Sequence, residues 1–118
     1  MKYENSIIKD YILRSFASCI RGSSYLESGI PSCQKVSIWV NSAENRVYVE
    51  AFCREKLYDD ESKWVKHYTR KFTAGEILRI METENLYESG SKKSPDQYAY
   101  DIWREISASE DAYYKDKE

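Results

Sequence analysis

The chain has 118 residues, a length typical of one domain, and its 18 basic and 20 acidic residues give a net charge of −2. Hydrophobic residues make up 42%, with only 4 Gly and 2 Pro, which excludes collagen-like, low-complexity and mostly disordered chains. The near-neutral charge also excludes a strongly basic protein that coats polyanions and a strongly acidic mimic of DNA.

The N-terminus and the cysteines indicate where the protein works. Residues 1–8 contain an early glutamate and lack the apolar core of a secretory signal, and no stretch approaches the roughly 18 apolar residues of a membrane helix. The cysteines, Cys19, Cys33 and Cys53, are odd in number and widely spaced, which favours reduced thiols over a disulfide framework. We therefore expect a cytoplasmic protein with no membrane association.

The first predicted element is a helix over residues 5–21. Its apolar side chains recur at helical spacing, Gly22 is a natural stop, and residues 22–34 are expected to form a loop. The period then changes to two, which predicts three strands near residues 36–41, 47–54 and 64–72. Turn-forming residues between them indicate an antiparallel meander.

The pairing of these strands follows from matching their faces. A four-residue first turn places Val40 opposite Val47 and, further along, Val36 opposite Ala51. In the second hairpin we expect four pairs of opposed residues. Three of these pairs share one face of the sheet, where two pairs join aromatic residues and one pair joins opposite charges. The four pairs are Cys53 with His67, Phe52 with Tyr68, Glu50 with Arg70, and Tyr48 with Phe72.

Two helices complete the predicted order. Thr73 and Glu76 form a capping box for a helix that ends near Asn85, and Pro95 opens a second helix whose last residues, 113–118, are expected to fray. The predicted fold class is α+β: a three-stranded antiparallel β-meander preceded by one helix and followed by two (α-β-β-β-α-α). Residues 1–118 are expected to form a single globular domain.

The order of the first five elements is that of the double-stranded-RNA-binding domain. The predicted second helix nevertheless opens with Thr73-Ala74-Gly75-Glu76, and a cluster of lysines that would bind phosphates is missing there. We therefore do not assign the chain to that family.

One face of the predicted sheet is aliphatic, and the other combines aromatic rings with cations. A helix could cover this second face, in which case its aromatics are core. The alternative is an exposed aromatic patch, which on a monomer indicates a binding surface. The candidate binding residues are Trp39, Tyr48, Phe52, Arg54, Trp64, Lys66, Tyr68, Arg70 and Phe72.

The binding partner could be a protein or a nucleic acid. Aromatic residues and arginine dominate protein interfaces, which favours a protein. The same face could stack single-stranded bases while its cations contact the backbone. The charge is unevenly spread, because residues 1–75 hold 12 bases and 9 acids whereas residues 76–118 hold 6 bases and 11 acids. Nucleic-acid binding therefore requires that the basic part of the fold be well segregated.

A thiol enzyme is a third hypothesis, because Cys53 and His67 are expected to face each other across a hairpin. Both lie in mid-strand on the aliphatic face, where a buried Cys is ordinarily a small hydrophobe. The spacing of cysteines and histidine does not fit a zinc site, and no phosphate-binding loop is present. We predict neither a cofactor nor a metal.

The sequence therefore predicts a non-enzymatic binding protein that occupies a surface of another macromolecule. Its small size, its aromatic richness (11 Tyr, 3 Trp and 3 Phe) and the lack of a catalytic motif resemble the small accessory or inhibitor proteins of phages and mobile elements, which implies an inhibitor, for instance of a host defence system. We also expect a homodimer, formed by pairing the poorly guarded edge at residues 36–40 or by stacking two aromatic faces.

Overall fold

The computed structural model describes residues 2–31, 34–56, 61, 63–81 and 94–117, with the backbone alone for residues 2–6. The predicted fold class is confirmed: one three-stranded antiparallel sheet has helices before and after it in the chain. The elements, in chain order, are α1 (Lys2–Arg21), α2 (Ser24–Glu27), β1 (Gln34–Asn41), β2 (Arg46–Arg54), β3 (Trp64–Thr73), α3 (Ala74–Met81) and α5 (Pro95–Lys117).

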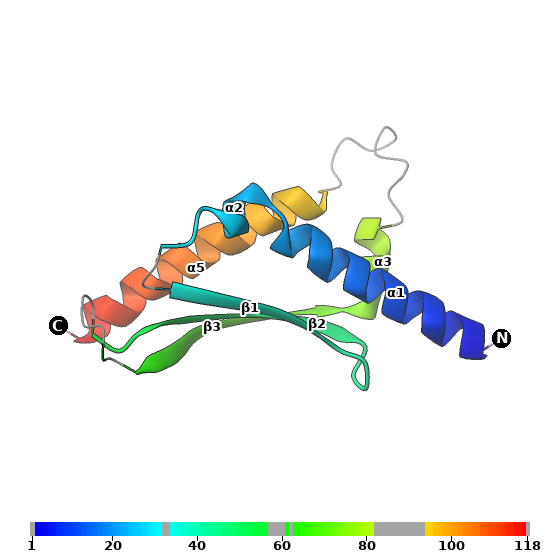
Figure 1. The fold of residues 1–118 in the computed structure, drawn as a ribbon, viewed down its shortest axis with the longest axis horizontal. Coiled ribbons are helices and arrows are strands. Elements are labelled where there is room, and N and C mark those ends of the chain that lie inside the picture. Colours follow the sequence, from blue (N-terminus) through cyan, green and yellow to red (C-terminus); the bar gives the residue numbers. More distant parts are fainter. Residues whose placement is uncertain (1, 32–33, 57–60, 62, 82–93, 118) are drawn as a thin grey trace.

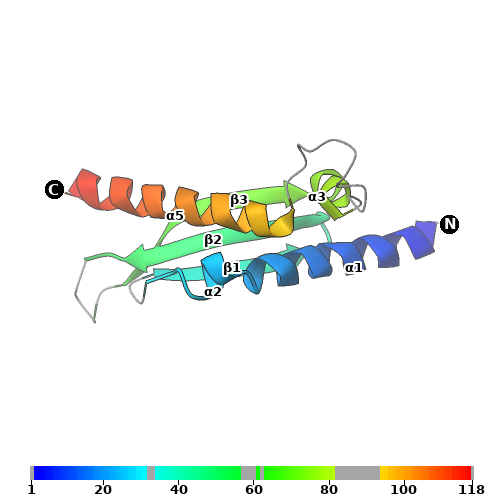
Figure 2. The ribbon, with the colours of Figure 1, turned by 90° about the horizontal axis from the view of Figure 1, so that it is seen from above.

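The helices form one layer and the sheet forms the other (Figure 1). Seen from above, α1 runs over β1 and α5 runs over β3, and the two helices also contact each other (Figure 2). The core lies between the layers, where α1 contributes Phe16, α5 contributes Ile102 and Ile106, and the sheet contributes Val47 and Phe72. Every one of these five side chains is fully buried.

The β1–β2 hairpin has the predicted register, with Val40 opposite Val47 and Val36 opposite Ala51. The turn between β1 and β2 contains asparagines, which favour its backbone conformation. Asn45 adopts a positive φ of 54°, a conformation that asparagine tolerates, and the Asn41 side chain accepts a hydrogen bond from the Glu44 amide at 3.1 Å. Local turn chemistry and matched faces together set this register.

The β2–β3 register is not the predicted one. Val47 lies opposite Phe72 and Ala51 opposite Tyr68, but the next pair is Phe52 with Lys66. The register thus shifts at a β-bulge, in which His67 is the additional residue of β3. Between the bulge and the end of β3, each side chain therefore lies on the opposite face from the one that unbroken alternation predicts.

The segment 22–34 and the end of α5 differ from the predictions. The expected loop at 22–34 contains the short helix α2, which begins after an N-cap in which the Ser23 hydroxyl accepts from the Tyr25 amide. Helix α5 begins at Pro95 as predicted, but it continues to Lys117 instead of fraying, because the Tyr114 hydroxyl donates to the Arg54 carbonyl oxygen at 2.5 Å. The predicted end of the preceding helix near Asn85 lies outside the described residues.

The capping box of α3 is confirmed. The Glu76 amide donates to the Thr73 hydroxyl at 3.2 Å, and the Glu76 carboxylate accepts from the Thr73 amide at 3.5 Å. This cap starts a helix directly at the end of β3, so that α3 packs against α1 on the same side of the sheet as α5.

Candidate binding surface

All described helices lie on one side of the sheet, and no described element covers the other side (Figure 1). We call this uncovered side the open face. The burial pattern of β2 shows that the two faces of the sheet differ, because every second residue, from Val47 to Cys53, is buried against the helices. The open face consists of Lys35, Ser37, Trp39, Asn41, Arg46, Tyr48, Glu50, Phe52, Arg54, Trp64, Lys66, Thr69, Lys71 and Thr73.

An aromatic pair lies on the open face at the edge of the sheet. Trp39 and Tyr48 are directly opposed on β1 and β2, and their rings stack with centroids 4.5 Å apart and planes 9° from parallel. Trp39 remains 39% exposed. The Tyr48 hydroxyl donates to Glu44 in the hairpin turn, which raises the pKa of Tyr48. The pair thus presents a preformed stack of two rings to solvent.

Glu50 is held at the centre of the open face. The Trp39 indole Nε1 donates to one carboxylate oxygen at 2.7 Å and the Lys66 ammonium donates to the other at 3.0 Å. These two hydrogen bonds, the one from Trp39 first, lower the pKa of Glu50. A single carboxylate therefore fixes the position of one aromatic ring and one cation.

Three other cations of the open face lie over its rings. The Lys35 ammonium is 4.3 Å from the Trp64 ring centroid, and the Arg54 guanidinium is 4.8 Å from the same centroid. The Lys71 ammonium lies 5.5 Å from the Tyr48 ring. Contacts of this kind, worth about 0.5–1 kcal/mol each at exposed sites, hold the cationic groups close to the sheet.

Charge is segregated between the two layers. Within the strands, which the structure describes in full, the open face has five basic residues and one acid, Glu50, a net charge of +4. Helix α5, on the opposite side of the sheet, has six acids and three bases, a net charge of −3. The basic open face and the acidic helix α5 therefore lie on opposite sides of the sheet, while α1, beside α5, has four bases and two acids.

The structure brings together six of the nine predicted binding residues and separates the other three. Trp39, Tyr48, Phe52, Arg54, Trp64 and Lys66 share the open face. The prediction that Tyr68, Arg70 and Phe72 lie beside them is wrong, because the bulge at His67 turns them to the face that the helices cover. Phe72 is fully buried in the core.

Tyr68 and Arg70 attach α5 to the sheet. The Tyr68 hydroxyl donates to one oxygen of Glu105 at 2.6 Å, and the Arg70 guanidinium donates to the other at 2.9 Å. Burial, followed by the bond to Glu105, raises the pKa of Tyr68 well above its usual range. The role of these two residues in the structure is to position the helix layer.

The same bulge adds Lys71 to the open face, which sequence reasoning missed. Lys66 and Lys71 are five residues apart, an odd spacing that would place them on opposite faces of a regular strand. The additional residue restores a common face, so both ammonium groups lie on the open side. Lys35 and Arg46 join them from β1 and β2. Alternation alone could not reveal Lys71, because nothing in the sequence marks the bulge.

The expected pairing of Cys53 with His67 is wrong. Cys53 lies opposite Val65 and is fully buried, so a substrate cannot reach its sulfur. His67 Nδ1 is 2.9 Å from the Ser109 hydroxyl, whose proton is donated to the His67 carbonyl oxygen at 2.6 Å. Among the described residues no group of three or more His, Cys, Asp and Glu side chains could hold a metal ion.

A small buried polar cluster lies beneath the C-terminal half of α5. Burial raises the pKa of the Glu110 carboxyl, the neighbouring Asp111 raises it further, and a hydrogen bond from Gln34 lowers it. One oxygen of Glu110 and the Gln34 side-chain oxygen are both buried without a hydrogen-bond partner. The cluster therefore disfavours a charged Glu110.

We predict that Glu110→Gln stabilises the protein at neutral pH, on the order of 1 kcal/mol, because an amide can donate to the Gln34 oxygen and carries no buried charge. A carboxyl whose folded pKa is raised stabilises the fold at low pH and loses that contribution as the pH rises through the folded pKa. The advantage of the variant should therefore shrink as the pH falls toward 4.5, the ordinary pKa of this group. Urea unfolding of the variant and the wild type across this pH range measures the difference in their free energies of unfolding. A difference that stays constant with pH would contradict the prediction.

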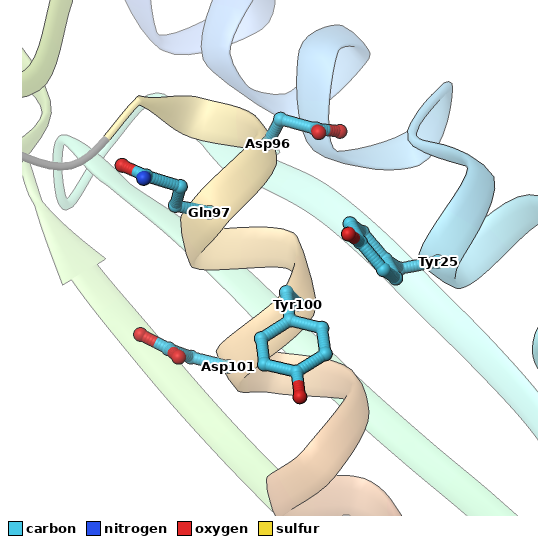
Figure 3. A pocket seen from close by; sticks show the side chains of 5 residues that line it. All are labelled: Tyr25, Asp96, Gln97, Tyr100 and Asp101. Atoms are coloured by element: carbon cyan, nitrogen blue, oxygen red, sulfur yellow. The ribbon is translucent and has the colours of Figure 1, made fainter.

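A shallow pocket of about 280 Å³ lies where α2 meets α5 (Figure 3). Tyr25 and Tyr100 contact each other edge to face, with ring centroids 4.9 Å apart. Asp96 accepts a hydrogen bond from the Ser23 hydroxyl at 2.7 Å, and the Trp103 indole donates to the Gly29 carbonyl at 3.1 Å. These contacts fasten α2 and the residues around it to α5.

No protein-family model matches the chain, and comparisons with curated proteins and with solved structures also yield no match. No helix in the described ranges combines the length and the apolar character that a membrane crossing requires. The case for a function therefore depends on the geometry of the open face.

Proposed function

We propose that the protein is a non-enzymatic binding protein, and that the open face is the surface with which it contacts another macromolecule. One observation carries the proposal: both layers of the fold are already packed against each other, yet four large aromatic rings lie on the uncovered side of the sheet. Aromatic side chains in such number are ordinarily buried or engaged with a partner. A protein of this size that occupies a partner's surface can act as an inhibitor, as the small accessory proteins of phages do.

The proposal can be tested by affinity capture. Immobilised protein is incubated with a lysate of the source organism, and the retained material is compared with that retained by the double variant Trp39→Ala/Trp64→Ala. Matched controls are Tyr11→Ala, which removes an exposed ring from α1, and Cys53→Ala. We expect the double variant alone to lose the retained material.

Two results would count against the proposal. Equal retention by the double variant and the wild type would show that the open face is not the binding surface. A folded Cys53→Ala variant that alone loses function would favour the thiol enzyme.

The predicted homodimer stays a proposal, and the charge of the open face decides between its two routes. Stacking two open faces would bring two surfaces of +4 together, whereas pairing through β1, an edge strand, would not. We therefore expect any dimer to form through the β1 edge. Sedimentation at micromolar concentration should give about twice the chain mass of 13.9 kDa and little change with salt. A mass equal to that of one chain contradicts the dimer.

A further inference from the structure

We propose that the occupant of the open face is a single-stranded nucleic acid, bound by base stacking and by phosphate contacts without strong sequence preference. This inference depends on the proposed function, since it names the partner of the same surface. The side chains that remain on the open face, the exposed part of the Trp39 ring and the distribution of charge support it.

The first step is the composition of the open face. The bulge removes Tyr68, Arg70 and Phe72 from this face and adds Lys71, so the surface keeps five basic residues but has two aromatic rings fewer than alternation predicts. The centres of protein interfaces are depleted of charged residues, lysine among them. Surfaces that bind single strands combine cations with aromatic rings. The open face has five basic residues among four rings, which matches the second type.

The second step is the position of Trp39. One face of its indole stacks on Tyr48, and β1 is an edge strand, so within one chain no further strand lies beside the other face of the ring. Trp39 also contributes to the lining of a hollow of about 500 Å³ between α1 and β1, where Arg14 pairs with Asp10 and Arg21 donates to the Ile38 carbonyl oxygen. A base that stacked on Trp39 would extend the existing pair to three rings.

The third step is the placement of the cations. Lys66 and Lys71 lie opposite Phe52 and Tyr48, which are four residues apart on β2, a separation of roughly 13 Å at about 3.3 Å per residue. Lys35 and Arg54 lie over Trp64, and Arg46 lies beside the hairpin turn. Positive charge is thus distributed along the face, as a backbone of several phosphates requires.

The fourth step is charge segregation. A chain with a net charge of −2 binds polyanions only if its acids lie away from the contact surface. Here the six acids of α5 lie on the far side of the sheet, and the strands carry one acid on the open face. That acid, Glu50, is already engaged by Trp39 and Lys66.

The test is fluorescence anisotropy with labelled oligo(dT) of 20 nucleotides at low salt. A 20-base-pair duplex and polyglutamate serve as competitors. We expect the single strand to bind more tightly than either competitor. The affinity should fall with salt, with a slope of about −0.7 in log–log form for each phosphate contacted.

Variants separate stacking from charge. Trp39→Ala should weaken binding by about five-fold or more, whereas Trp39→Phe, which keeps a ring and loses only the bond to Glu50, should retain most of the affinity. The double variant Lys66→Gln/Lys71→Gln should reduce the magnitude of the slope of log affinity against log salt concentration by about 1.4. Glu50→Gln should strengthen binding, because it removes the acid that neutralises Lys66. Tyr11→Ala and Lys9→Gln, on α1, should bind as the wild type does.

Each contrary outcome has a definite meaning. Duplex binding as tight as that of the single strand would overturn the stacking role, and equal displacement by polyglutamate would point to an acidic protein surface instead. If capture from the lysate depends on the open face but is unchanged after nuclease treatment, the partner is not a nucleic acid, and the proposed function still holds. Capture that is independent of the open face would overturn both.

Discussion

Phe72→Ala should destabilise the protein by about 3–5 kcal/mol, the cost of truncating a fully buried aromatic ring. Phe72 packs edge to face against Phe16 of α1, with ring centroids 5.0 Å apart, so its removal leaves a cavity between the two layers. Trp39→Ala should cost only about 1–2 kcal/mol, because the indole is 39% exposed and mainly loses its stack with Tyr48.

Urea unfolding of the two variants, fitted with a common slope, measures this difference. The comparison also tests the bulge, since unbroken alternation would place both rings on one face and make the two substitutions similar in cost. Similar values for the free energy of unfolding would therefore contradict the observed register.

Gly29→Ala should destabilise the contact between α2 and α5 by about 1–3 kcal/mol. A Cβ atom at this position would collide with the Tyr25 carbonyl oxygen and would lie 2.9 Å from the Trp103 indole nitrogen. The same indole donates to the Gly29 carbonyl oxygen, so the added methyl group would also disturb that hydrogen bond. Thermal unfolding should show the loss.

Gly75→Ala provides the matched control with the opposite sign. Gly75 lies in the first turn of α3, and the nearest atom to an added Cβ is the Thr73 hydroxyl oxygen at 3.9 Å. Alanine is the better helix former, so this variant should gain up to about 1 kcal/mol. A destabilised Gly75→Ala, or a Gly29→Ala variant as stable as the wild type, would contradict the packing described here.

The sequence was informative wherever structure is set by local chemistry. The β1–β2 register follows from a four-residue turn and two strands that alternate without interruption, and the start of α3 follows from the capping box at Thr73. In each case neighbouring residues supply the interactions that fix the backbone.

The two largest errors arise from contacts between distant residues. The bulge at His67 is stabilised by Ser109 of α5, 42 residues later, and α5 persists to its end because Tyr114 bonds to Arg54, 60 residues earlier. Helix α2 is only four residues long, too short to show a period. A single unrecognised bulge moved three candidate residues to the face that the helices cover and placed Lys71 on the open face.

The separation of charge between the layers gives the molecule an electric dipole that points from α5 through the sheet to the open face. A negatively charged partner would turn the protein before contact, so that productive encounters outnumber those at the helix layer. Such steering acts over about 8 Å at physiological ionic strength and over longer distances in dilute salt. Added salt should therefore slow association with a polyanion through lost orientation, even though the protein as a whole carries a net charge of −2 and would be repelled if it behaved as a point charge.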